Sequence, residues 1–235
     1  MRRNLSILMV SCLFVAPIAE AAQPTPTTEE DKALYALGVI ISGNLQPFAL
    51  TARELEMVEA GITDGVQDKV SLKDLESYGP KLQELQKTRS AVVAGKEKAA
   101  GAAYLAKAAA EKDATKTASG IVIKTLTAGT GASPTAKDQV KVHYEGKFVD
   151  GKVFDSSIER KEPVTFPLTG VIPCWTEAVQ KMKVGGKVQI VCPSDLAYGD
   201  QGRPPQIPGG ATLVFQVELL GIVKASAATP AVPGK

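Results

Sequence analysis

Residues able to perform acid–base or nucleophilic chemistry are few in this 235-residue chain. His143 is the only histidine, and the alternation of the surrounding sequence places it on the strand face opposite Val142 and Tyr144. A Ser–His–Asp or Cys–His arrangement would have to be built on this one side chain. We therefore do not expect His143 to be catalytic.

Three cysteines are present, and one of them, Cys12, lies in an apolar run at the N-terminus. The other two, Cys174 and Cys192, are too few to build a Cys/His metal cluster with one histidine, so we expect no metal and no cofactor. Their spacing is far from the Cys-x-x-Cys of redox enzymes. Both are predicted to face one core, which favours a disulfide in an oxidising compartment; two buried free thiols are the alternative.

Aromatic side chains gather in residues 139–221, which contain the only tryptophan and four of the six phenylalanines. Several lie at or next to inward-facing positions: Tyr144, Phe154, Trp175, Tyr198 and Phe215. They could simply form an aromatic core. A buried tyrosine needs a hydrogen-bond partner, however, and two tyrosines with Asp155 in an otherwise apolar set are typical of a lined cavity. We therefore predict a ligand pocket.

The element that must position these residues is a domain predicted over residues 117–224. Alternating apolar residues predict about five strands, mostly joined as hairpins, and apolar spacing after Pro173 predicts one short helix on a face of the sheet. This combination indicates an α+β domain. The tail, residues 225–235, is rich in Ala and Pro and is predicted to be disordered.

Residues 23–92 are predicted to form a helical domain. Capping boxes at Thr27-x-x-Glu30 and Thr51-x-x-Glu54 mark helix starts. These short helices make a thin core for a monomer, so we expect a second copy of the chain to complete it, as a homodimer. A self-contained three-helix bundle is the alternative. Residues 93–116 lose their large apolar side chains and are predicted to form a solvated connecting helix.

Residues 1–22 are typical of a signal peptide. Arg2 and Arg3 precede an apolar run of about fourteen residues, too short to span a membrane, and the small residues around Glu20 suit a cleavage site. The chain is 44% apolar with a formal net charge of +2, which gives no reason to expect a nucleic-acid partner or membrane insertion. We expect an exported protein.

The sequence resembles the FKBP-type peptidyl-prolyl cis-trans isomerases, the macrolide-binding family, over roughly residues 118–223. Five motifs carry the resemblance: VHYEG at 142–146, GKVFDSS at 151–157, GVIPCW at 170–175, LAYG at 196–199 and IPGGATLVFQVEL at 207–219. The whole layout is similar to the exported bacterial subgroup that includes the macrophage infectivity potentiator and periplasmic FKBP chaperones.

The resemblance implies an N-terminal helical dimerisation domain, a long connecting helix, and a C-terminal antiparallel sheet wrapped on a short helix. It also implies the site. The catalytic residues would be Tyr144, Phe154, Asp155, Tyr198 and Phe215, and the substrate-binding residues Phe166, Val171, Ile172, Trp175 and Ile207. The sequence departs from the family at Val164, where many members have an aromatic residue, at Cys174, where Gly is common, and at Arg203, where some members have His.

The implied function is isomerisation of X–Pro bonds in exported proteins during folding, in the periplasm or on the outer surface of a Gram-negative bacterium. Partners would be proline-containing polypeptides, unfolded exported proteins and macrolide inhibitors. Rotation about an amide makes and breaks no bond, so it needs neither a nucleophile nor a metal. The alternative function is a dimeric holdase chaperone that binds unfolded chains, with isomerase activity secondary.

Overall fold

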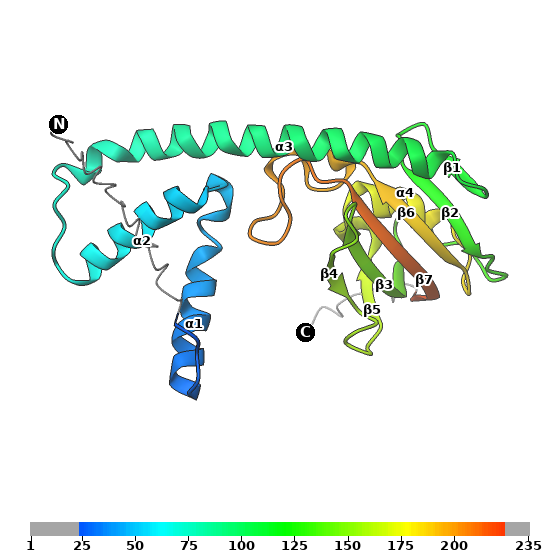
Figure 1. Ribbon diagram of the computed structural model, residues 1–235. Helices are drawn as coiled ribbons and strands as arrows, with labels where there is room; N and C mark the ends of the chain where they lie inside the picture. The colour runs from blue at the N-terminus through cyan, green and yellow to red at the C-terminus, as the bar shows by residue number, and fades with distance from the viewer. Residues whose placement is uncertain (1–23, 224–235) are drawn as a thin grey trace, which may run out of the picture. The chain divides into compact units, whose positions relative to one another are not determined.

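The computed structural model describes residues 24–223 (Figure 1). The predicted signal peptide and disordered tail lie outside these residues. Contacts divide the chain into one unit that ends at Ile40 and a second that begins at Ile41. The helices are α1 (Glu29–Ser42), α2 (Ala52–Val66), α3 (Gly79–Ala109) and α4 (Pro173–Gln180), with short 3₁₀ helices at Gln46–Phe48, Leu75–Tyr78, Leu168–Gly170, Ser194–Leu196 and Gly199–Gln201.

The first helix, α1, begins one residue later than the sequence suggested. The Thr28 hydroxyl accepts a hydrogen bond from the Asp31 N–H at 3.0 Å, and the Thr28 N–H donates to the Asp31 carboxylate at 2.9 Å. The reciprocal cap therefore pairs Thr28 with Asp31, and the predicted pairing of Thr27 with Glu30 is wrong. Overlapping Thr-x-x-acid spacings explain the error, because either threonine can accept from the first helical turn.

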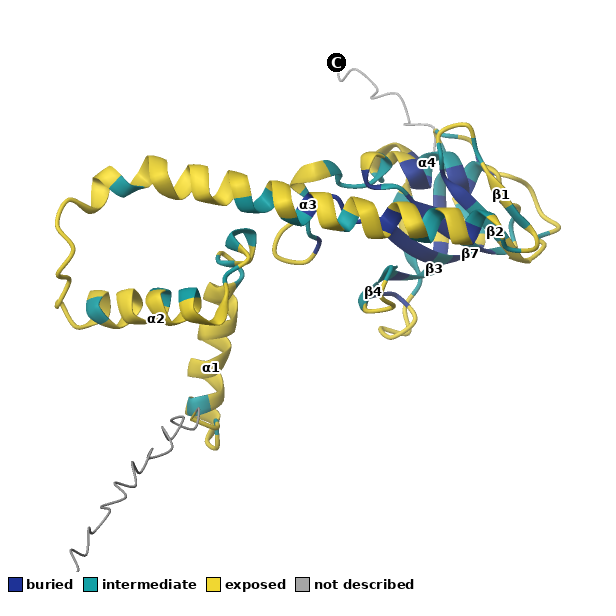
Figure 2. Cartoon of the chain, turned by 45° about the horizontal axis from the view of Figure 1, so that its top comes forward, coloured by how far each residue is buried: buried dark blue, intermediate teal, exposed yellow. Residues whose placement is uncertain are grey.

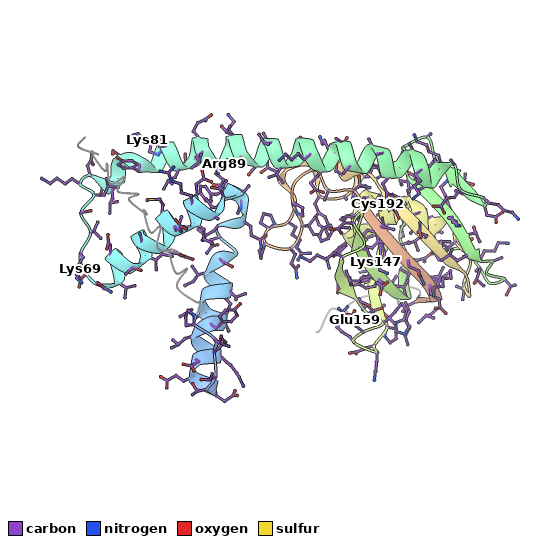
Figure 3. All side chains as sticks on the ribbon, in the orientation of Figure 1. Lys69, Lys81, Arg89, Lys147, Glu159 and Cys192 are labelled. Atoms are coloured by element: carbon purple, nitrogen blue, oxygen red, sulfur yellow. A yellow bond between two sulfur atoms is a disulfide. The ribbon has the colours of Figure 1, made fainter. Side chains whose placement is uncertain are left out.

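The second predicted cap is confirmed. Thr51 and Glu54 form a capping box at the start of α2. Glu54 also accepts two hydrogen bonds from the guanidinium of Arg89, at 2.6 and 2.8 Å. Arg89 lies on α3 and is labelled in Figure 3. The Arg89 hydrogen bonds and the capping bonds hold the pKa of Glu54 well below its ordinary value. One carboxylate thus both caps α2 and joins it to α3.

The C-terminal domain is built on an antiparallel sheet of seven strands in the order β1-β2-β6-β7-β3-β4, with β5 paired to β3. The strands are β1 (Ala114–Lys116), β2 (Val122–Thr127), β3 (Gln139–Phe148), β4 (Val153–Ser156), β5 (Val164–Pro167), β6 (Lys187–Cys192) and β7 (Leu213–Val223). The α+β prediction is confirmed, although two strands were not foreseen. One of them, β1, is only three residues long.

Alternation along the strands gives the sheet two covered faces. On one face the core includes Ile190, Leu213 and Val217 and is closed by α4 through Val179 and Trp175. On the other face a smaller cluster of Val122, Val191 and Val214 contacts Ala108, Tyr104 and Leu105 of α3. Figure 2 shows buried residues concentrated in this domain, whereas α1 and α2 are almost entirely exposed.

The expectation that residues 93–116 form a solvated connecting helix is wrong for one stripe of the helix, which faces the sheet and the segment before β7. Ala94, Gly101 and Ala108 are buried, seven residues apart on one face of α3. A Cβ on Gly101 would stand 2.1 Å from the Thr212 Oγ1, so the missing side chain is what permits this approach. The large apolar residues lost from the sequence are replaced by small ones that let helix and sheet come close. Residues 114–116 belong to the sheet.

Gly101→Ala should lower the free energy of unfolding, although alanine is the better helix former by about 1 kcal/mol. Thr212 is buried and its χ1 is stiff, so the added methyl forces overpacking that costs about 1–3 kcal/mol. Gly95→Ala is the matched control, because nothing lies within 4 Å of its Cβ position. It should stabilise the protein. Urea unfolding of both variants checks this; equal stabilisation would contradict the packing.

Candidate functional site

Strands β3 and β4 bring an aromatic and an acidic side chain to one place through a break in their pairing. Gly146 pairs with Asp155 and Lys147 with Val153, so Phe154 is an extra residue on β4. Such a bulge re-aims side chains that would otherwise point to opposite faces, and Phe154 and Asp155 both line the same cavity. A Cβ on Gly146 would stand 2.6 Å from the Phe154 ring, so glycine makes room for it.

The cavity has a volume of about 420 Å³ and lies between the sheet and the start of α4. Its lining consists of Tyr144, Phe154, Asp155, Phe166, Gly170, Val171, Ile172, Trp175, Tyr198, Arg203 and Phe215. Trp175 is only 4% exposed, which makes it the floor. Three aromatic rings meet it edge to face, with centroids at 5.5 Å (Tyr144), 5.4 Å (Phe166) and 5.3 Å (Phe215). The result is a cage of aromatic rings around the floor of a cavity that opens to solvent.

One polar network stands at the rim of this cage. The Tyr144 hydroxyl donates to the Asp155 carboxylate, which also accepts from Arg160 at 2.5 Å; Arg160 reaches the Tyr144 hydroxyl at 3.3 Å. Burial acts to raise the pKa of Asp155, but the hydrogen bonds from Tyr144 and Arg160 outweigh it and the pKa lies below its ordinary value. Burial, with the Asp155 bond, raises the pKa of Tyr144. At neutral pH Asp155 is therefore an anion compensated by Arg160.

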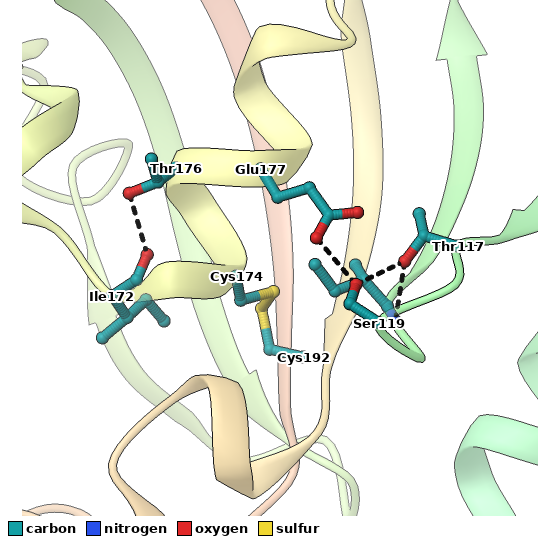
Figure 4. The surroundings of a disulfide bond; sticks show 8 residues. Thr117, Ser119, Ile172, Cys174, Thr176, Glu177 and Cys192 are labelled. Carbon is teal, nitrogen blue, oxygen red and sulfur yellow. Dashed lines mark hydrogen bonds between the residues drawn. A yellow bond between two sulfur atoms is a disulfide. The ribbon is translucent and has the colours of Figure 1, made fainter. Parts of the chain in front are cut away.

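A disulfide joins the cavity floor to the sheet. Cys174, in the first turn of α4, is bonded to Cys192 at the end of β6, with their Cα atoms 5.7 Å apart (Figure 4). Both side chains are fully buried. Because Trp175 follows Cys174 directly, the bond fixes the start of the helix that carries the floor.

Residues 24–223 have neither a candidate metal site nor a candidate membrane span. No group of three or more His, Cys, Asp or Glu there could hold a metal ion. Nor does that stretch contain a helix with the length and hydropathy needed to cross a membrane.

Comparison with known proteins gives the family. Residues 131–220 match the family model described as "FKBP-type peptidyl-prolyl cis-trans isomerase", and residues 30–124 match the domain that precedes it in such proteins. The isomerase FkpA of Aeromonas hydrophila is 39% identical over 221 residues, which cover 89% of this chain and 82% of that protein. The chain belongs to the FKBP-type peptidyl-prolyl cis-trans isomerase family. It catalyses the rotation of X–Pro peptide bonds.

Further relatives are similar to this isomerase in sequence or in structure over more than half of its length. The 22 kDa FKBP-type isomerase of Escherichia coli is 38% identical over 85% of this chain and 98% of its own. The crystal structure of Escherichia coli FkpA matches with a TM-score of 0.65 at 34% identity, over 86% of this chain and all of that one. An isomerase structure from Pseudomonas syringae matches with a TM-score of 0.52 at 38% identity, over 55% of this chain and 96% of its own.

All of the predicted site residues except Ile207 line the isomerase's cavity. Ile207 is not among the lining residues; it is 4% exposed and belongs to the same core as Trp175 and Phe215. Its role in substrate binding stays a prediction. Alternation cannot place a residue in the loop between β6 and β7. His143 does not line the cavity; its Nδ1 lies 3.1 Å from the Ser157 hydroxyl.

Three residues near the cavity were not predicted as site residues: Gly170, Arg203 and Arg160. Gly170 and Arg203 line it, and Arg160 pairs with Asp155. Gly170 stands inside the GVIPCW motif, and Arg203 was recognised only as a departure from the family. Nothing in the sequence marks Arg160, because its contact with Asp155 depends on how the segment after β4 turns back.

Proposed function

We propose that this cavity is where X–Pro bonds rotate. Tyr144, Phe154, Asp155, Tyr198 and Phe215 act as the catalytic side chains, and Phe166, Val171, Ile172 and Trp175 bind the substrate. The edge-to-face packing of three aromatic rings on Trp175 carries the proposal, because it builds an open cavity with aromatic walls and polar groups at its edge. Such sites hold a small apolar ring and orient it by hydrogen bonds.

The chemistry of the reaction suits such a cage. The barrier to rotation about a peptide bond is about 18–20 kcal/mol, because resonance makes the bond partly double and separates charge over the planar amide. The twisted amide has lost that resonance and carries less separated charge. An apolar enclosure therefore favours the twisted form over the planar one, which lowers the barrier without any covalent step.

Orientation of the substrate would come from polar groups at the rim. Ile172 is the residue before α4, and its N–H donates no hydrogen bond within the described part of the chain. We assign the Ile172 N–H and the Tyr198 hydroxyl as the donors to the carbonyl oxygens of the substrate. Asp155 is already compensated by Tyr144 and Arg160, so its charge does not oppose the entry of an apolar proline ring.

Fluorescence of Trp175, the only tryptophan of the chain, tests the proposal directly. A short X–Pro peptide and a macrolide inhibitor of FKBP enzymes should each change its emission and should compete with one another. The same peptide with alanine in place of proline is the control and should change the emission far less. If the isomerisation rate reached saturation with the proline peptide while neither the Trp175 emission nor macrolide binding changed, the substrate site would lie elsewhere.

We also propose that the helical half forms a homodimer. Large apolar side chains on α1, α2 and the first half of α3 are exposed in the single chain: Leu34, Leu37, Ile40 and Ile41; Leu55 and Ile62; Leu82, Leu85 and Val92. Burial of these faces by a second copy would stabilise short helices that lack a core of their own. Sedimentation velocity should give about twice the chain mass; a monomer at micromolar concentration would contradict it.

We further infer that the isomerase works outside the cytoplasm, in the periplasm or on the outer surface of a Gram-negative bacterium. The signal-peptide pattern of residues 1–22 supports export. The buried disulfide supports an oxidising compartment. The relatives named above are described as isomerases, so their names support the isomerase function and not the holdase alternative.

A further inference from the structure

The loop between β6 and β7 carries one wall of the isomerase cavity. Tyr198 and Arg203 line the cavity from this loop. The loop is held together internally: the Gly210 N–H donates to the Gly199 carbonyl at 2.8 Å, and the Arg203 N–H donates to the Ile207 carbonyl at 2.7 Å. A loop connected in this way moves as one piece, so whatever fixes its outer side also fixes Tyr198.

The outer side of the loop lies against one stripe of α3. Ala94, Lys98 and Gly101 stand at i, i+4 and i+7, which places them on the same face of the helix. Gly210 has a φ of +76°, and a Cβ there would stand 2.4 Å from the Ala94 carbonyl oxygen, so backbone approaches backbone. The contact of Gly101 with Thr212 lies about two turns further along the helix.

Lys98 reaches from the middle of this stripe to both sides of Tyr198. Its Nζ lies 2.5 Å from the Asp200 Oδ1 and 3.7 Å from the Asp195 Oδ1. These acids stand three residues before and two residues after Tyr198 in the sequence. The hydrogen bond with Asp200 raises the pKa of Lys98, so the ammonium keeps its charge at neutral pH.

We propose that Lys98 is a positioning residue for catalysis: from the long helix it holds Asp195 and Asp200, and so sets where Tyr198 stands in the cavity. The inference rests on the proposed role of Tyr198 in substrate binding. It makes α3 part of the catalytic apparatus, because a residue outside the sheet domain's own sequence controls one wall of the site.

The expected effect is on substrate affinity and not on global stability. The three side chains are 42% (Lys98), 80% (Asp195) and 59% (Asp200) exposed, and ion pairs this exposed add little to folding. Loss of the contact instead lowers the fraction of molecules whose loop is in place. Apparent affinity falls by that fraction, while the turnover of bound substrate is unchanged. KM should therefore rise by up to about fivefold at constant kcat, the largest effect that a surface ion pair allows.

The test uses the full-length protein and an X–Pro tetrapeptide, with KM and kcat measured beside the melting temperature. Lys98→Met removes the charge and keeps most of the side chain's length, whereas Lys98→Arg restores the charge. Lys96→Met is the matched control, an exposed lysine on the same helix for which residues 24–223 offer no ion pair. We expect the KM increase in Lys98→Met alone, with Lys98→Arg close to wild type and all melting temperatures similar.

Asp200→Asn should raise KM as Lys98→Met does, and the double variant should be no worse than Lys98→Met alone, because the loss of Lys98 already removes the contact with Asp200. A Lys98→Met protein with wild-type KM, or with a lowered melting temperature and unchanged KM, would overturn the positioning role. Tyr198→Phe is measured in parallel. Wild-type kinetics in Tyr198→Phe would overturn the proposed function of that hydroxyl, whereas wild-type KM in Lys98→Met would overturn only the role of Lys98.

Discussion

Phe154→Ala should lower kcat/KM for isomerisation of an X–Pro tetrapeptide about thirtyfold. The ring lines the cavity and packs edge to face on Phe215, with centroids 5.7 Å apart. Its removal opens the wall of the cage to water, so the twisted amide loses an apolar neighbour worth about 2 kcal/mol, the usual value for burying a large apolar side chain. That loss corresponds to the predicted factor when it is confined to the transition state.

Phe148→Ala is the matched control. Phe148 also packs against Phe154, with centroids 5.1 Å apart, but does not line the cavity. It should cost stability through lost packing and change kcat/KM by only about twofold at temperatures where the protein is folded. Isomerase assays of both variants, with Trp175 fluorescence to verify folding, check the prediction. Activity within twofold of wild type in folded Phe154→Ala would remove this wall from the mechanism.

The sheet domain could be predicted well because its signals are local. Strict alternation at Val188, Ile190 and Cys192 assigned the inner face of β6, and the structure confirms it. The aromatic residues of the cavity lie at such alternating positions or inside short motifs, so their gathering follows once the strands pair. The presence of Asp155 among them indicated a cavity and not a plain core.

Other features depend on contacts that no local pattern encodes. The bulge that brings Phe154 and Asp155 to the same cavity arises from pairing with β3, where Gly146 leaves the space. Strict alternation would place these neighbours on opposite faces. The contact of Arg160 with Asp155 depends in the same way on how the chain turns after β4.

The burial of α3 was missed for a different physical reason. Ala94, Gly101 and Ala108 recur every seven residues, but a hydrophobicity pattern gives them little weight because they are small. Their role is to permit close approach: Ala108 packs against Val122, Val191 and Val214 on the sheet, whereas Ala94 and Gly101 meet Gly210 and Thr212 before β7. A stripe of small residues on an otherwise charged helix should therefore be considered as a packing face when a sheet with a second apolar side follows.

Removal of the disulfide by Cys174→Ala with Cys192→Ala should lower the free energy of unfolding by about 3 kcal/mol. The bond closes a loop between residues 18 apart in sequence, and cross-linking a loop of about this size removes that much conformational entropy from the unfolded chain. Both positions are fully buried, so the lost sulfur atoms add a smaller packing cost. Under native conditions kcat/KM should change less than twofold, because Trp175 stays packed against Tyr144, Phe166 and Phe215.

Reduction of the disulfide distinguishes the stability that the cross-link contributes from the stability that the packing of the two sulfur atoms contributes. Wild-type protein unfolded in urea with dithiothreitol loses the bond but keeps both sulfur atoms, so its unfolding midpoint should fall most of the way to that of the double variant. The double variant itself should be indifferent to the reductant. The buried sulfurs are out of reach in the folded state, so reduction should require unfolding and leave native activity unchanged for as long as the protein stays folded. If the midpoints with and without reductant coincided for the wild type, the bond would contribute nothing to stability.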